Sequence, residues 1–141
     1  MNEQTKNPEL ENMLTELDPP YEWKEELAIG RMLDQYGIPF FYKQPTIIYA
    51  QGKNEVWHPT FTLSRYGGFV IDYMAEPFGQ DQRDSILKRE QLYNYNQIPS
   101  VVLGPKDLNK PGWQESLYKK LGQRLPQPIE AGNYAMSYSH Q

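Results

Sequence analysis

Two strand-forming stretches on either side of the glycine pair Gly67-Gly68 constrain the fold of this chain more than any other feature. Residues 55–63 are rich in aromatic and β-branched side chains, and residues 69–75 alternate between two faces. Because paired glycines readily form tight turns, the pattern predicts an antiparallel hairpin of residues 55–63 and 69–75. Pro59 lacks the N–H that a strand interior uses, so it indicates an edge or a strand end.

The pattern after the hairpin predicts a parallel crossover. Residues 80–95 form a polar helix, and the short apolar run 99–103 that follows is typical of a buried strand. A helix over 21–36, a strand over 40–49 and a helix over 111–125 complete the order. We therefore expect an α/β domain with a mixed sheet flanked by helices.

We expect three segments along the chain. Residues 1–20 form an acidic N-terminal arm, residues 21–125 the domain, and residues 126–141 a flexible tail rich in Pro, Gly and Ser. The arm contains a short amphipathic helix over 8–17, ended by Pro19-Pro20. We expect its apolar face to pack on the domain or on a protein partner, and we expect the tail to be disordered or bound by a partner.

The composition narrows the classes of partner and location. The arm has five acidic residues against one Lys, so it carries the whole net charge of −4 and leaves the rest balanced. Proteins that bind nucleic acid tightly on their own usually have an excess of Lys and Arg, which residues 21–141 lack.

The chain has no Cys, which excludes disulfides and thiolate metal sites. It also has no apolar run of about 20 residues, so we expect no membrane partner. We expect a cytoplasmic protein.

The predicted hairpin carries the most informative motif. The stretch Trp57–Leu63 followed by Val70–Met74 resembles the PD-(D/E)XK nuclease superfamily, in which a Pro-Asp-Phe-x-Leu strand pairs with a Glu-x-Lys strand. Glu26 in the first helix, Gly37–Phe40 after it, and the later helix leading into Ile98–Val102 match the layout of that family. The resemblance covers residues 21–125 and implies a restriction-endonuclease-like fold.

The resemblance also implies a chemistry. In that family two carboxylates on adjacent strands hold Mg²⁺, which polarises a phosphate and activates a water. A Lys two residues after the second acid orients the water and stabilises the developing charge. A Glu from the first helix often completes the metal shell.

Only part of this site carries over to the present chain. Pro59 matches the motif Pro, but Thr60 stands where the first Asp belongs. Asp72 matches the second acid, whereas Met74 stands in the place of the Lys. Glu26 matches the helix acid, and the resemblance therefore implies one strand carboxylate and one helix carboxylate.

Two further positions are candidates for residues that have moved within the site. Glu76 follows Asp72 near the strand end, and Lys88, with Arg89 beside it, lies on the next helix. An active site would then combine Asp72, Glu26 and Lys88 as catalytic residues with Asp72, Glu26 and Glu76 as Mg²⁺ ligands.

Each candidate also has a structural interpretation. Asp72 lies in an apolar strand, where a carboxylate must be satisfied by a local Arg, Ser or Tyr. Glu25, the other register for the helix acid, and Glu26 both favour the first turn of a helix. His58 fits a surface histidine, and Lys88 fits a solvated helix face.

Three functions follow from these observations. The first is a nuclease-like domain that no longer cleaves and acts as a nucleic-acid-associated binding, structural or regulatory module in a larger assembly. The second is an active Mg²⁺-dependent DNA endonuclease with a rearranged site. The third is an unrelated protein-interaction function on the same scaffold.

Overall fold

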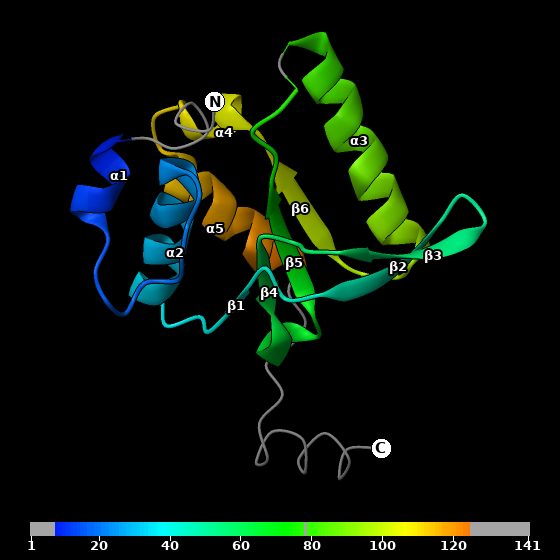
Figure 1. The fold of residues 1–141 in the computed structure, drawn as a ribbon, viewed down its shortest axis with the longest axis horizontal. Coiled ribbons are helices and arrows are strands. Elements are labelled where there is room, and N and C mark those ends of the chain that lie inside the picture. Colours follow the sequence, from blue (N-terminus) through cyan, green and yellow to red (C-terminus); the bar gives the residue numbers. More distant parts are fainter. Residues whose placement is uncertain (1–7, 78, 125–141) are drawn as a thin grey trace, which may run out of the picture.

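The computed structural model describes residues 8–77 and 79–124, and it has a mixed α/β architecture (Figure 1). A four-stranded sheet has the strand order β1-β4-β5-β6, and β2 and β3 form a separate two-stranded sheet. In chain order, the elements are α1 (Pro8–Met13), α2 (Lys24–Gln35), β1 (Phe41–Tyr42), β2 (Thr46–Ala50), β3 (Lys53–Trp57), β4 (Phe61–Leu63), the 3-10 helix η2 (Ser64–Tyr66), β5 (Phe69–Tyr73), α3 (Gln80–Tyr95), β6 (Ser100–Leu103), α4 (Pro105–Leu108) and α5 (Trp113–Arg124).

The predicted hairpin and the predicted crossover are both confirmed. Strands β4 and β5 pair antiparallel with Phe61 opposite Ile71, and Gly67 and Gly68 have the positive φ angles of 73° and 77° that this connection requires. Strand β6 then pairs parallel to β5 after the α3 crossover, with Asp72 opposite Val102. The expected mixed sheet flanked by helices is therefore present.

Two of the predicted strands are interrupted, which corrects their boundaries. The predicted strand 55–63 divides into β3 and β4, which belong to different sheets, and Pro59 lies in the gap between them. The predicted strand 40–49 divides in the same way into β1 and β2, at Lys43, which has a φ of 58°, and Pro45. Because proline cannot donate to a strand ladder, each break falls where the sheet pairing ends.

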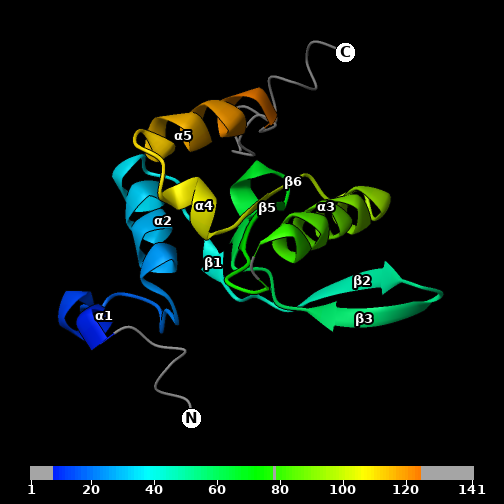
Figure 2. The same ribbon diagram turned by 90° about the horizontal axis from the view of Figure 1, so that it is seen from above.

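Alternation along β5 divides the interior into two hydrophobic cores. Phe69, Ile71 and Tyr73 point into the core that α2 and α5 cover, together with Phe61 of β4. Val70 points into a second core, which contains Tyr93 of α3 and residues of β2. Figure 2 shows α2 and α5 on one side of the sheet, with α3 and the β2–β3 hairpin on the other. The side chain of Asp72, between Ile71 and Tyr73, therefore points toward the α3 side.

The N-terminal helix is shorter than predicted but docks on the domain. Helix α1 ends at Met13, because the Asp18 carboxylate accepts a hydrogen bond from the Thr15 N–H just beyond it. Leu10 is buried in the first core and Leu14 packs against it, whereas Leu17 is 95% exposed. An ion pair of 2.7 Å between Asp18, in the loop after α1, and Arg31 of α2 connects the two helices.

The C-terminal predictions are tested only in part. Leu117 and Leu121 of α5 are buried, as their four-residue spacing predicts. The tail over 126–141 lies outside the described residues. Among the residues that the structure describes, no helix is long and apolar enough to cross a membrane.

Candidate functional site

Asp72 is the centre of the predicted site, and the residue is only 3% exposed. One oxygen, Oδ1, accepts hydrogen bonds from the Thr60 backbone N–H at 3.2 Å and from the Thr60 hydroxyl at 3.0 Å. The other oxygen, Oδ2, accepts one from Arg89 Nε and one from the Tyr93 hydroxyl, each at 2.6 Å. Four donors thus surround a carboxylate that burial would otherwise make costly.

Helix α3 supplies the charge partner and closes the site. Arg89 and Tyr93 are four residues apart, so both side chains leave α3 on the face toward β5. The Arg89 guanidinium lies 4.2 Å from the centre of the Trp57 ring, and the Trp57 ring meets that of Tyr93 edge to face at 5.3 Å. Asp72, Thr60, Arg89, Tyr93 and Trp57 form what we call the Asp72 cluster.

The charges in the Asp72 cluster shift the pKa values of its members. Burial disfavours the Arg89 cation, but attraction to the Asp72 carboxylate outweighs burial and raises the pKa of Arg89. Burial and the Asp72 charge both raise the pKa of the Tyr93 hydroxyl. Both groups therefore keep their protons and serve as permanent donors to Asp72.

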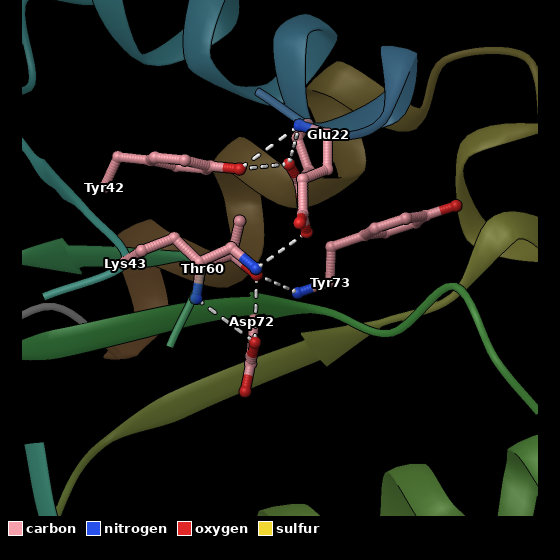
Figure 3. Close-up of polar contacts among 7 residues, drawn as sticks. Glu22, Tyr42, Lys43, Thr60, Asp72 and Tyr73 are labelled. Atoms are coloured by element: carbon pink, nitrogen blue, oxygen red, sulfur yellow. Dashed lines mark hydrogen bonds and ion pairs between the residues drawn. The ribbon is translucent and has the colours of Figure 1, made fainter. Parts of the chain in front are cut away.

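The structure brings the two motif positions of the hairpin together. The Thr60 hydroxyl, which stands in place of a motif carboxylate, donates to Asp72 and accepts a hydrogen bond of 3.0 Å from the Tyr73 N–H (Figure 3). Met74, in the place of the motif Lys, is half-buried and packs in the second core on the α3 side. Thr60 is therefore a hydrogen-bond partner of Asp72, and Met74 is part of the second hydrophobic core.

The structure does not bring Glu26 to Asp72. Glu26 is 1% exposed, and its Oε1 accepts hydrogen bonds from the Tyr42 hydroxyl at 2.6 Å and the Glu22 N–H at 3.0 Å. Its charge also acts on Tyr73, whose ring lies in the core that α2 covers. Figure 3 shows Tyr42 and Glu22 on the side of the sheet away from the Asp72 carboxylate. Glu26 therefore lies across the sheet from Asp72.

Glu26 gives a prediction about pH. Burial raises the pKa of Glu26 above its ordinary value of 4.5, against the opposing effect of the hydrogen bonds from Tyr42 and Glu22. A raised pKa in the folded state means that the protonated form stabilises the fold, and that this contribution is lost as pH rises from 4.5 through the raised pKa. Relative to Glu26→Gln, which does not titrate, the parent should therefore lose stability as pH increases.

Urea unfolding at intervals from pH 4.5 to about pH 8 measures this difference. The exposed variant Glu115→Gln removes the same charge and is the control for a change in net charge. A difference between parent and Glu26→Gln that stays constant across this range would contradict the prediction.

The remaining candidates lie on the surface. Glu76, Lys88 and His58 are all exposed, and the α3 side chains that reach Asp72 are those of Arg89 and Tyr93. Within residues 8–77 and 79–124, no group of three or more His, Asp or Glu side chains is placed to hold a metal ion. The proposed ligands Asp72, Glu26 and Glu76 thus do not form a common cluster.

The residues around Asp72 do not fit the Mg²⁺ that the resemblance implies. Mg²⁺ requires oxygen ligands with free lone pairs in a near-octahedral arrangement. Both oxygens of Asp72 already accept two hydrogen bonds each, and the Arg89 cation stands where a metal ion would neutralise the carboxylate. The Thr60 hydroxyl donates to Asp72 and adds no negative charge.

Sequence reasoning named Arg89 only as the neighbour of Lys88 and did not assign Tyr93 or Trp57 to the surroundings of Asp72. A usable signal was present, because Arg89 and Tyr93 are four residues apart on a helix that crosses over to a strand beside β5. A buried acid needs such donors, so this spacing marks them as its partners.

No protein-family model matches this chain, and no curated protein or solved structure matches it.

Proposed function

We propose that this chain is a PD-(D/E)XK nuclease-like domain that has lost metal-dependent cleavage. In this proposal the domain has a restriction-endonuclease-like fold and acts as a non-catalytic binding module in a larger, nucleic-acid-associated assembly. The observation that carries the proposal is the state of Asp72, the acid that matches the motif, whose carboxylate is held by Thr60, Arg89 and Tyr93.

Three further observations support the proposal. Helix α2, the antiparallel β4–β5 pair and the α3 crossover to parallel β6 follow the order that the resemblance implies. The Arg89 guanidinium donates to Asp72 at 2.6 Å and stacks on the Trp57 ring at 4.2 Å, so a protein cation is held beside the carboxylate that the motif reserves for a metal ion. The balanced charge of the body favours contact with nucleic acid through an assembly rather than tight binding alone.

The purified protein is expected to leave plasmid DNA, single-stranded DNA and RNA intact in the presence of Mg²⁺ or Mn²⁺. The matched variants Glu76→Gln and Lys88→Ala alter exposed side chains and should keep the fold, so they test the rearranged site directly. Gel assays of all three proteins should match the buffer control. Metal-dependent cleavage by the parent that either variant abolishes would establish the active endonuclease instead.

A further inference from the structure

The β2–β3 hairpin has an outer edge that faces away from the rest of the chain. In Figures 1 and 2 the hairpin extends beyond the main sheet, and in Figure 2 β2 lies between α3 and β3. Asn96 at the end of α3 closes the inner edge, because its side-chain amide accepts from the Tyr49 N–H at 2.9 Å and donates to the Tyr49 carbonyl at 3.1 Å. Strand β3 is left as the outer strand.

The pairing of the hairpin determines which backbone groups of β3 face outward. Tyr49 directs its N–H and C=O toward Asn96, so the pair Tyr49–Asn54 exchanges no hydrogen bonds within the hairpin. Because the two kinds of pair alternate, Ile47–Val56 is of the same kind. Asn54 and Val56 therefore point their N–H and C=O groups outward, and no hydrogen bond joins these groups to the part of the chain that the structure describes.

The side chains of β3 carry a self-complementary charge pattern. Lys53 and Glu55 lie two residues apart on one face, and Asn54 lies between them. Lys53 is exposed and makes no ion pair with any described residue. An acid opposite Lys53 and a base opposite Glu55 would stabilise an antiparallel pairing with β3, and a second β3 offers both. The Glu55 carboxylate also accepts a hydrogen bond of 3.0 Å from Trp57 Nε1.

We propose that β3 pairs antiparallel with β3 of a second copy of this chain, about a twofold axis at Asn54. The two Asn54 residues then exchange the hydrogen bonds that are free on each edge, which is the pairing that their outward groups require. Lys53 of each copy lies opposite Glu55 of the other in a close pair without backbone hydrogen bonds, where side chains interact most strongly. A twofold axis at Glu55 would instead set two carboxylates against each other.

The same pairing extends an exposed apolar surface. Ile47 and Val56 are 68% and 60% exposed and lie opposite each other on the outer face of the hairpin. Tyr49, which stacks on Tyr95 with ring centres 6.3 Å apart, lies on the same face. Joining two hairpins makes a continuous four-stranded sheet and removes two open strand edges. This inference does not rest on the loss of cleavage.

A single-cysteine experiment tests the register, because the chain has no Cys of its own. Paired Asn54 residues would have Cα atoms about 5.5 Å apart, within disulfide range, so Asn54→Cys should form a disulfide-linked dimer rapidly on mild oxidation. The exposed helix variant Lys119→Cys is the control and should cross-link far more slowly. Equal rates for the two variants would overturn the register.

Charge reversal tests the same contact in the absence of a cross-link. Sedimentation should show a concentration-dependent dimer for the parent, and Lys53→Glu should weaken it about tenfold or more by opposing like charges. The double variant Lys53→Glu/Glu55→Lys restores opposite charges and should recover the dimer, with melting temperatures confirming that each variant is folded. A parent that stays monomeric up to about 1 mM, or a double variant no better than the single one, would overturn the proposal.

Discussion

Asp72→Asn is expected to destabilise the fold by about 3–5 kcal/mol, because it breaks a buried ion pair and leaves the charge of Arg89 uncompensated. The amide that replaces one carboxylate oxygen is a donor and would face the donors of Arg89 and Tyr93 or of Thr60. Since small domains are stable by only about 5–15 kcal/mol, the loss should be visible as partial unfolding at 37 °C.

This outcome distinguishes a structural Asp72 from a catalytic one. An acid held for metal binding is usually a burden on stability, and its removal leaves the fold unchanged or stabilised. Urea unfolding of Asp72→Asn should be compared with Asp84→Asn, an exposed acid on α3 whose loss should change stability by only about 0.5 kcal/mol or less. An Asp72→Asn protein as stable as the Asp84→Asn control would remove the main support for the proposed function.

A double-mutant cycle identifies the partner of Asp72. Arg89→Met keeps an apolar stem near the Trp57 ring but removes the charge, so it also leaves a buried carboxylate unpaired. The double variant Asp72→Asn/Arg89→Met leaves no unpaired charge and should lose markedly less stability than the sum of the single variants. Additive losses would mean that the two side chains do not act as a pair.

The central hairpin and the crossover were predictable because their signals are local. Gly67-Gly68 and the alternation of residues 69–75 specify a turn and a strand with two faces. The division of residues 55–63 was not predictable in the same way, because strand-forming residues do not reveal which sheet a strand joins. Pro59 indicated an end but could not tell an edge of one sheet from a passage between two.

The candidate site was predictable at the strand and not at the helices. The pairing of Thr60 with Asp72 follows from the hairpin register. The resemblance implied that Glu26 lies beside Asp72. A helical pattern could not test this, because it identifies the apolar face of α2 but does not show which face of the sheet the helix covers. Lys88 and Arg89 differ by about 100° around α3, a rotation that only the packing against β5 resolves.

One carboxylate, that of Asp72, connects several elements of the fold. Its four hydrogen bonds join β5 to the segment before β4 and to α3, which closes the second core. Under the proposed function, Thr60 replaces the motif Asp, which would repel Asp72, with a hydroxyl that donates a hydrogen bond to it. The Asp72 carboxylate then stabilises the fold. The Thr60 hydroxyl is the side chain on which that change depends.

Thr60→Asp is therefore expected to destabilise the protein by about 2–4 kcal/mol in the absence of metal and to make its stability depend on Mg²⁺. Thr60 is 2% exposed, and a carboxylate there would face Asp72 Oδ1, on the side away from Arg89, where two anions cannot both stay ionised without cost. Two adjacent carboxylates are a usual ligand pair for Mg²⁺, so Mg²⁺ should raise the melting temperature of this variant, and adding Met74→Lys should increase the affinity for the metal. The matched control is Thr62→Asp, in β4 two residues after Thr60, which should be destabilised without any recovery by Mg²⁺. A parent protein that gains as much from Mg²⁺ as Thr60→Asp does would show that Asp72 already binds metal, and the non-catalytic proposal would then be wrong.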